Sequence, residues 1–497
     1  MGPASRRSSP RRVPVSELDA RRERLEQLRA QGHDPYLITR FDRTHTIDEV
    51  RSAFDALVGQ PVTIAGRVMA RRGHGKATFL DLRDGTSAMQ VFASLDSLGD
   101  DGYERLKLCD VGDLLGVEGE VFSTSRGEMS VRASKATILS KSLRPLPEKW
   151  HGLTDVETRF RRRYVDLIMN PEVRELFVQR SHMLAAIREM LTGRGFLEVE
   201  TPMMQVVAGG AAARPFCTHH RALDIELYLR IAPELYLKRL VIGGFERVFE
   251  INRNFRNEGM DQNHNPEFTM LELYQAYADY EDIMSLTEEI VAAAAQAVCG
   301  GLQISYGGQE IDLTPPWRRL SIPDALRQYA GIDISDLLDD ASAARIADER
   351  GIEIGGPKTA AAVLKKIVDE TVEPQLVAPT HLTGHPVLIS PLAKRSPANP
   401  ELTDRFETFI CGKELANAFS ELNDPIDQRS RFESQARDRS AGDEEAHPMD
   451  EDFLEALEYG LPPTGGLGIG IDRLLMLLTD THSIREVILF PLMRPQE

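Results

Sequence analysis

The alternation of hydrophobic and polar positions in residues 246–274 predicts a long antiparallel hairpin. In its first half Phe249, Ile251 and Phe255 fall on one strand face, and polar side chains occupy the positions between them. A polar loop that contains Gly259 follows, and the second half alternates again. The other face carries an arginine, two glutamates, an aromatic ring and a phenol, which are costly to hold together without a ligand. An edge hairpin with solvated charges is the alternative interpretation.

Residues 61–143 predict a different architecture, because five short alternating segments there are separated by turn signals. A helical stretch at residues 103–108 lies between the third and fourth segments. Five strands with a helix in that place are typical of an OB-fold barrel, whose exposed face can stack unpaired bases. A barrel used only for packing is the alternative. We assign residues 144–165, which begin with a proline-containing stretch, to a linker.

Helical patterns dominate much of the remaining chain. Residues 1–60 combine a basic Ser/Pro-rich tail with a charged helix at 15–31, whose thin leucine stripe predicts light packing. Another helix is predicted at 281–298, and a mainly helical block at 321–376 begins with a capping signal. Residues 405–424 return to alternating strands around a reversal.

Composition narrows the class of protein. The chain has 497 residues, which suggests about three domains, and its 42% hydrophobic and 27% charged content is that of an ordinary soluble globular protein. Its four cysteines form no CxxC pair, which argues against a zinc site and fits a reducing cytoplasm. No apolar run is long enough for a membrane span. The net charge of −18 disfavours a polyanionic partner, but basic clusters at 71–76 and 159–163 permit nucleic-acid binding.

Three motifs in order resemble the signature motifs of class II aminoacyl-tRNA synthetases. The second motif is the run Arg256-Asn257-Glu258 on the hairpin; the first lies at 195–202 and the third at 466–473. The longer string FEINRNFRNEG…HNPEFTMLELY resembles bacterial lysyl-tRNA synthetases specifically. Three motifs in this order across most of the chain are far more specific than any one of them.

The resemblance implies an α+β protein with an N-terminal OB-fold β-barrel and a class II catalytic domain at residues 166–497. That domain would be a mostly antiparallel sheet flanked by helices, with residues 321–376 as a helical insertion. The implied enzyme is a cytoplasmic homodimer without membrane attachment. It would activate L-lysine with ATP and Mg²⁺, and transfer the product to the 3′ end of tRNA-Lys.

The same resemblance implies roles for individual residues. Arg256 and Arg473 are the expected catalytic residues, as clamps on the ATP phosphates. Mg²⁺ is expected at Glu407 and Glu414. The expected ATP-binding residues are Arg256, Glu258, His264, Asn265, Phe268, Glu407, Glu414, Gly470 and Arg473. The expected anticodon-binding residues are Arg72, Phe79, Gln90 and Glu128.

The residue types of the expected lysine pocket independently favour a cationic substrate. Two carboxylates and a phenol suit a long cationic side chain, because the carboxylates offset the ammonium charge and the phenol orients it. A glutamate that only pairs with a nearby arginine such as Arg230 is the alternative. Strict alternation puts Glu414 and Glu421 on opposite strand faces, so a bulge or a later strand start is needed if both line one pocket. The expected lysine-binding residues are Gly210, Glu234, Glu272, Tyr274, Asn417, Phe419 and Glu421.

Two positions depart from the family pattern, and other functions stay open. Asn263 stands where the family often has a basic residue, and Ala208 where it usually has proline. An aspartate or asparagine synthetase of the same subclass is one alternative. A non-catalytic paralogue that binds ligand as a sensor, or a ligase that adds lysine to a protein, are others. The phosphate-binding arginines argue against the sensor, and the OB domain argues against the protein ligase.

Overall fold

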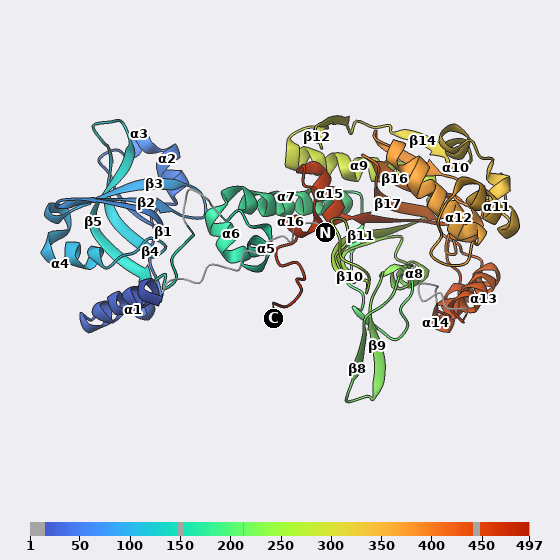
Figure 1. The fold of residues 1–497 in the computed structure, drawn as a ribbon, viewed down its shortest axis with the longest axis horizontal. Helices are drawn as coiled ribbons and strands as arrows, with labels where there is room; N and C mark the ends of the chain where they lie inside the picture. The colour runs from blue at the N-terminus through green and yellow to red at the C-terminus, as the bar shows by residue number, and fades with distance from the viewer. Residues whose placement is uncertain (1–14, 148–152, 212, 441–447, 497) are drawn as a thin grey trace, which may run out of the picture. The chain divides into compact units, whose positions relative to one another are not determined.

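The computed structural model describes residues 15–147, 153–211, 213–440 and 448–496 (Figure 1). The basic tail expected at residues 1–14 and part of the expected linker, 148–152, lie outside these ranges. The chain packs as two compact units. The first runs to Arg159 and includes Tyr164–Met169, and the second holds Phe160–Arg163 and the chain from Asn170.

In the first unit five strands close into a barrel in the order β1-β2-β3-β5-β4, with helix α4 between β3 and β4. Alternate residues such as Leu80 and Leu82 point inward and are fully buried, as the period of a strand requires. The predicted OB-fold is confirmed. The elements of this unit are α1 (Val15–Ala30), η1 (Pro35–Leu37), α2 (Ile47–Ser52), α3 (Phe54–Leu57), β1 (Pro61–His74), β2 (Ala77–Arg83), β3 (Ala88–Ser94), α4 (Leu95–Lys107), β4 (Leu114–Ser123), β5 (Met129–Ser140), α5 (Val156–Arg161) and α6 (Arg163–Met169), whose limits straddle the division between the units.

Helix α1 is held more firmly than its thin leucine stripe predicts. Leu28 is buried in the barrel core, and Arg21 donates to the carbonyls of Val111 and Ser142. Arg24 forms an ion pair of 2.5 Å with Asp110. Polar contacts to the barrel therefore replace the apolar area that the helix lacks.

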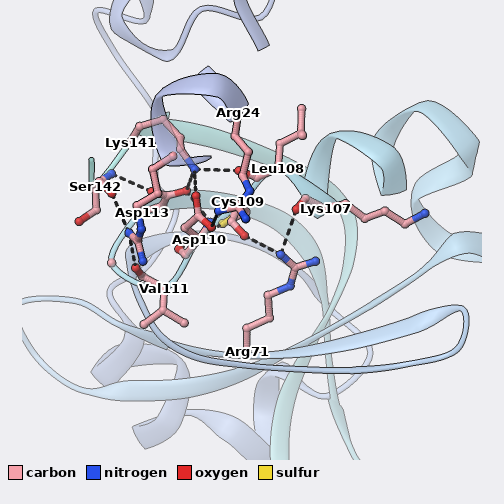
Figure 2. A network of polar contacts seen from close by, with 12 residues as sticks. Arg24, Arg71, Lys107, Leu108, Cys109, Asp110, Val111, Asp113, Lys141 and Ser142 are labelled. Carbon is pink, nitrogen blue, oxygen red and sulfur yellow. Dashed lines mark hydrogen bonds and ion pairs between the residues drawn. The ribbon is translucent and has the colours of Figure 1, made fainter. Parts of the chain in front are cut away.

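The centre of this polar network is Lys141, whose side chain is fully buried (Figure 2). Its Nζ donates to Asp110 at 2.7 Å, to Asp113 at 2.6 Å and to the carbonyl of Leu108 at 2.7 Å. A buried ammonium needs such a full set of acceptors, because an unpaired charge would be strongly destabilising.

The second unit is built on an eight-stranded mixed sheet in the order β14-β15-β16-β17-β18-β11-β10-β6. Only β14–β15 and β10–β6 pair in parallel, so the predicted mostly antiparallel catalytic sheet is confirmed. Its strands are β6 (Leu197–Glu198), β10 (Arg247–Phe255), β11 (Glu267–Ala276), β14 (Arg318–Ser321), β15 (Thr380–Thr383), β16 (Arg405–Ile410), β17 (Lys413–Ser420) and β18 (Thr464–Gly470).

Helices α7 (Pro171–Gly193), α9 (Tyr280–Cys299) and α15 (Ile471–Leu478) contribute to the main core with one face of this sheet. Phe249 and Leu271 of the hairpin are buried there, as its alternation predicts, and Leu467 of β18 is buried in the same core. The sheet residues between them therefore face the other side, which α8 (Glu234–Ile242) and α14 (Glu451–Glu458) cover only in part.

The helical block lies between β14 and β15, which are neighbours in the sheet, so it forms a crossover connection between two paired strands. It has its own core, in which Leu326, Val363 and Ile367 are buried. The block comprises α10 (Ile322–Ala325), η2 (Leu326–Ala330), η3 (Ile334–Leu337), α11 (Asp340–Arg350), α12 (Ala360–Ile367), η4 (Val368–Val372) and η5 (Glu373–Gln375).

Smaller elements complete the second unit. A three-stranded sheet of order β7-β9-β8 and a hairpin of β12 and β13 lie outside the main sheet. Across the four described ranges, no helix is both long enough and apolar enough to cross a bilayer. The remaining elements are β7 (Met204–Gln205), β8 (Cys217–His220), β9 (Ile225–Leu229), β12 (Gln303–Tyr306), β13 (Gln309–Asp312), η6 (Val387–Ile389), α13 (Pro425–Ser440) and α16 (Ile484–Val487).

Candidate active site

Strand register brings the polar residues of three strands onto one face of the main sheet. Glu272 of β11 lies opposite Gly468 of β18, which in turn lies opposite Asn417 of β17. One step along, Tyr274, Gly466 and Phe419 form a second such row. Residues directly opposite each other in antiparallel strands point to the same face, so these side chains surround a floor made of glycine backbone.

A cavity of about 770 Å³ lies on this face, within the size range of small-molecule sites. Each ATP- or lysine-binding residue expected from the sequence lines it, with the exception of Glu407. The structure therefore brings together residues from five separate parts of the chain. Those that line the cavity are Gly210, Glu234, Arg256, Glu258, His264, Asn265, Phe268, Glu272, Tyr274, Glu414, Asn417, Phe419, Glu421, Gly470 and Arg473.

A β-bulge explains how Glu414 and Glu421 reach the same cavity. Thr408 pairs with Ala416, but the next residue, Phe409, pairs with Glu414, so one residue of β17 is extra. A bulge of this kind reverses which face the following side chains occupy. Strict alternation, which separates the two carboxylates, is wrong at this point of the strand.

The glycines of β18 keep the floor of the cavity bare. A Cβ atom on Gly466 would overlap the Glu421 carboxylate and lie 2.6 Å from the ring of Tyr274. At Gly468 it would lie 3.1 Å from the mobile end of Met270, and at Gly470 it would make ordinary contact with Arg473. Only Gly466 is therefore required by close packing of the pocket itself.

At one end of the cavity two buried carboxylates hold a buried ammonium. Glu234 begins helix α8, and Lys238 lies one turn later on the same face, with its Nζ 2.6 Å from Glu234 Oε1. The same Nζ forms an ion pair with Glu421 Oε2. Arg230 pairs with Glu250 at 2.7 Å. Arg230 is therefore not the partner of a pocket glutamate; Glu234 and Glu421 pair with Lys238 instead.

The electrostatics of this end favour one more cation. Burial raises the pKa of Glu272 to about 8, with a further contribution from the charge of Glu234. Burial also raises the pKa of Tyr274 and of Glu421 well above their ordinary values. Burial opposes the charge of Lys238, yet its two carboxylate neighbours raise its pKa. Two carboxylates thus contact one ammonium, and Glu272 adds a third carboxyl group to this largely buried end of the cavity.

The raised pKa of Glu272 predicts how stability varies with pH. The folded protein keeps this carboxyl protonated up to a pH of about 8, whereas the unfolded chain ionises it near 4.5. Its contribution to stability is therefore complete below 4.5 and is lost as pH rises towards 8, at about 1.4 kcal/mol per pH unit. Glu272→Gln should remove this loss, as measured by urea unfolding at pH 5, 6, 7 and 8.

The matched control is Glu120→Gln, which changes an exposed carboxylate on the barrel. It should reproduce the wild-type dependence of the free energy of unfolding on pH. A Glu272→Gln profile with the same slope as that control would show that Glu272 ionises normally in the folded protein.

The other end of the cavity holds two arginines, Arg256 and Arg473, beside the carboxylates of Glu258 and Glu414. Arg256 lies 5.1 Å from the ring centroid of Phe268, and its Nε is buried without a hydrogen-bond partner within the described residues. Burial lowers the pKa of this guanidinium, although nearby carboxylates including Glu258 act in the opposite direction. A guanidinium in this state has hydrogen-bonding capacity left for an anion.

Arg473 joins the third motif to the hairpin loop. Its Nη1 donates to the carbonyl of Glu414 at 2.9 Å and to the carboxylate at 3.2 Å, and its Nη2 lies 3.3 Å from His264 Nε2. Asn263 accepts from Lys413 Nζ at 3.2 Å, so β17 supplies a cation beside the position where the family often has one. Asn265 donates to the carbonyl of Glu267 and keeps a buried Oδ1 free of protein partners in the described chain.

Glu407 is held just outside the lining. Arg405 donates to its carboxylate at 2.5 Å and to Asn417 Oδ1 at 3.1 Å, so one arginine orients both side chains. On the helical block, Glu373 has a pKa raised to about 8 by burial, then by Asp369 and by Glu407. No cluster of three or more metal-ligating side chains exists among the residues that the structure describes.

The outer face of the barrel carries an aromatic row. Phe79 of β2 lies opposite Phe92 of β3, with ring centroids 5.1 Å apart, and Phe122 follows at 6.1 Å from Phe92. Phe79 is partly exposed and lies outside the barrel core, so packing alone does not account for it. Arg132 caps the row with its guanidinium 4.6 Å from the Phe122 ring.

The other three expected anticodon residues lie around this row. Arg72, which pairs with Phe79 across β1 and β2, makes a bidentate ion pair with Asp81 at 2.7 and 3.0 Å. Gln90 accepts from Ser130 at 3.2 Å, and Glu128 is exposed at the start of the β5 hairpin arm.

Two family models match these two units. Residues 155–494 match "tRNA synthetases class II (D, K and N)", and residues 62–139 match "OB-fold nucleic acid binding domain". The chain is 58% identical over 493 residues to the lysine–tRNA ligase of Pelotomaculum thermopropionicum, covering 99% of this chain and 97% of that one. The chain belongs to the class II lysine–tRNA ligase family.

Other members of this family are similar along their whole length. The lysine–tRNA ligase of Carboxydothermus hydrogenoformans is 57% identical over 97% of this chain and 98% of its own. The lysine–tRNA ligase of Bacillus subtilis is 54% identical over 96% of this chain and 97% of its own. The prediction of a lysine–tRNA ligase is confirmed, and the comparisons give no support to a sensor paralogue or to an aspartate or asparagine enzyme.

Sequence reasoning missed two residues of this class II site, Lys238 and Arg405. A signal for Lys238 existed, because Glu234 and Lys238 have the i, i+4 spacing that puts two side chains side by side on a helix. No local signal distinguishes Arg405 from a solvated strand arginine. Its contacts come from the neighbouring strand β17 and from η6, between β15 and β16.

Proposed function

We propose that the cavity of the second unit forms lysyl-adenylate from L-lysine and ATP, and that the lysyl group is then transferred to tRNA-Lys. The observation that carries this proposal is the charge separation along the cavity. Glu234, Glu421 and Tyr274 occupy one end, and Arg256 and Arg473 the other. A cationic side chain and a polyphosphate therefore have complementary ends in one cavity.

At the anionic end the ε-ammonium of lysine binds Glu234 and Glu421, and the Tyr274 hydroxyl orients it. The raised pKa values at this end support that assignment, because a bound cation favours the ionised carboxylates that burial and, secondarily, neighbouring negative charges disfavour. Phe419 packs on the methylene stem. Gly210, Asn417 and Glu272 surround the α-amino and carboxylate groups.

At the cationic end Arg256 contacts the α-phosphate. Phe268 stacks on adenine, and Glu258 accepts from its exocyclic amine. Arg473 and His264 contact the outer phosphates, and Asn265 and Gly470 complete the nucleotide site. The unsatisfied Nε of Arg256 and Oδ1 of Asn265 support this arrangement, since buried polar groups are normally paired.

The chemistry needs positioning and charge stabilisation more than proton transfer. The lysine carboxylate, already ionised, attacks the α-phosphorus, and the bond from that phosphorus to the pyrophosphate oxygen breaks. Arg256 stabilises the charge that develops on the phosphoryl oxygens. The terminal hydroxyl of the tRNA then attacks the lysyl carbonyl carbon, and AMP leaves.

Mg²⁺ is the proposed cofactor, with Glu407 and Glu414 as its protein ligands. Carboxylate oxygens are the ligands that Mg²⁺ prefers, and it commonly takes only one or two of them together with phosphate oxygens. Glu407 and Glu414 lie on the paired strands β16 and β17, and a pair of carboxylates fits that pattern. When bound, the ion would neutralise charge on the phosphates.

A direct test is amino-acid-dependent ATP–pyrophosphate exchange with each of the twenty amino acids. We expect exchange with lysine to exceed that with any other amino acid by several powers of ten. Aspartate or asparagine as the best substrate would overturn the proposal, and so would lack of exchange with lysine in the presence of Mg²⁺.

We further propose that the barrel binds the anticodon of tRNA-Lys through Arg72, Phe79, Gln90 and Glu128. Phe79→Ala should lower kcat/KM for aminoacylation by about 5- to 150-fold, because one stacked base contributes roughly 1–3 kcal/mol. Lysine-dependent exchange should not change, since that step needs no tRNA. Steady-state kinetics of both reactions measures the difference.

Phe41→Ala is the matched control for this prediction. Phe41 packs over Gly116 of β4, six residues along that strand from Phe122, or about 20 Å at 3.3 Å per residue. The control should leave both reactions near wild type. If Phe79→Ala lowered exchange and aminoacylation equally, Phe79 would be a structural residue of the barrel.

The active form that we propose is a cytoplasmic homodimer. Strand β6 is an edge of the main sheet, and Leu197 on it is 47% exposed. Met203, Met204 and Val206 nearby in the chain are 47% to 65% exposed. Exposed apolar groups at a sheet edge favour association with another copy. Light scattering at micromolar concentration should give twice the mass of the chain, and a monomer would contradict the dimer.

A further inference from the structure

Lys238 is a fully buried cation directly behind the lysine pocket. Its side chain has no exposed surface, it does not line the cavity, and its Nζ contacts one oxygen of Glu234 and one of Glu421. The ring centroids of Phe419 and Phe453 lie 5.5 and 5.9 Å from the same Nζ. The ammonium is thus surrounded by two carboxylates and two aromatic rings, and its own freedom to move is small.

The two carboxylates that Lys238 contacts come from distant parts of the chain. Glu234 is on helix α8, and Glu421 follows strand β17, where its backbone N–H donates to the carbonyl of Thr464 at 2.8 Å. Within the described residues Glu421 Oε1 is buried without a hydrogen-bond partner, and it lies against Gly466 and Tyr274. One oxygen of each carboxylate is therefore anchored behind the pocket.

Anchoring both carboxylates sets the depth at which an incoming ammonium can bind. Without Lys238, each glutamate could rotate towards a shorter side chain, and repulsion between the two would push them apart. With Lys238 in place, neither carboxylate can move away without breaking its ion pair with the Lys238 ammonium. That break would leave a buried charge unpaired in an apolar site. The position of the bound ammonium is then fixed by the protein and not by the substrate.

We propose that Lys238 is a positioning residue for amino-acid specificity. By anchoring Glu234 and Glu421 it makes the pocket accept a primary ammonium at the end of four methylene groups and reject the same group one methylene closer. This inference rests on the proposed lysine activation. It adds a residue that acts through the two carboxylates without touching the substrate.

The test compares lysine with ornithine, which has one methylene group fewer, in ATP–pyrophosphate exchange. In Lys238→Met, the KM for lysine should rise at least 30-fold, and the ratio of kcat/KM for lysine over ornithine should fall at least tenfold. The KM for ATP should stay within threefold of wild type. Lys238→Arg keeps the positive charge but places it differently. Its KM for lysine should therefore lie between those of wild type and Lys238→Met, while the ratio of kcat/KM for lysine over ornithine stays low.

Lys141→Met is the matched control, because Lys141 is also fully buried and also contacts two carboxylates, Asp110 and Asp113 (Figure 2). It lies in the barrel unit, so it should lower thermal stability and leave both exchange parameters unchanged. Circular dichroism identifies which variants are folded. If Lys238→Met does not fold, Lys238→Arg alone decides the outcome through the lysine-to-ornithine ratio.

The two possible failures can be told apart. If the wild-type protein does not exchange with lysine, the proposed function itself is wrong. If the wild type exchanges and a folded Lys238 variant keeps the wild-type ratio of lysine over ornithine, the inference about Lys238 is wrong. Equal increases in the KM for lysine and the KM for ATP would also overturn it, because they would indicate general damage to the site.

Discussion

Arg256→Ala is expected to lower the kcat of lysine-dependent ATP–pyrophosphate exchange by about 10²- to 10³-fold. The guanidinium lies over Phe268 in the cavity, and its buried Nε has no protein partner in the described chain, so it is available to a phosphoryl group. Loss of one such charge-stabilising donor costs about 3–4 kcal/mol in the transition state. Pre-steady-state measurement of adenylate formation isolates this step from product release.

The same change should not harm the fold. Burial already lowers the pKa of Arg256, so the folded protein bears a cost for keeping this charge, and removing it should leave the melting temperature equal or higher. Arg253→Ala is the matched control, three residues earlier on the same hairpin, where the arginine pairs with Glu267 at 3.7 Å. Exchange by Arg256→Ala within threefold of the Arg253→Ala value would remove Arg256 from the mechanism.

Glu234→Gln is expected to raise the KM for lysine by about two to three and a half powers of ten and to change the KM for ATP little. The amide keeps the shape of the side chain but removes one of the two charges that meet the substrate ammonium. Breaking a buried ion pair on one side costs about 3–5 kcal/mol. Lys238 keeps its contact with Glu421, so the variant should still fold.

Isothermal titration with lysine in the absence of ATP measures this affinity directly. Glu288→Gln is the control, because Glu288 is another buried carboxylate of the same unit, paired with His381 and with the backbone of Trp317. It should lower stability without changing lysine affinity. A Glu234→Gln variant that binds lysine as tightly as wild type would disprove the assignment of the pocket.

The part of the site that lies on the central hairpin is predictable from sequence. The alternation from Phe249 onwards separates core residues from cavity residues, and the strand register of β10 and β11 places Glu272 and Tyr274 where that alternation requires. Period-2 patterning carries this information because helices cover one face of the sheet and cover the other only in part.

Other parts depend on contacts that no local pattern encodes. The bulge between β16 and β17 shifts Glu414 by one position, and only pairing with the neighbouring strand reveals it. Lys238 and Glu421 are 183 positions apart, so their ion pair depends on how α8 and β17 pack in the folded chain. The firm attachment of α1 is similar, because Arg24 meets Asp110 only after the barrel has closed.

Gly466 has a consequence for how resistance to an inhibitor could evolve. Any larger residue there would overlap Glu421 and Tyr274, which are the groups that recognise the lysine side chain in the proposed site. A lysine-mimicking compound that rests on this glycine therefore contacts a surface that point mutation cannot reshape while substrate recognition survives. Escape mutations against such a compound should appear at other positions of the floor, for example at Gly468, where only the far end of the Met270 side chain must yield.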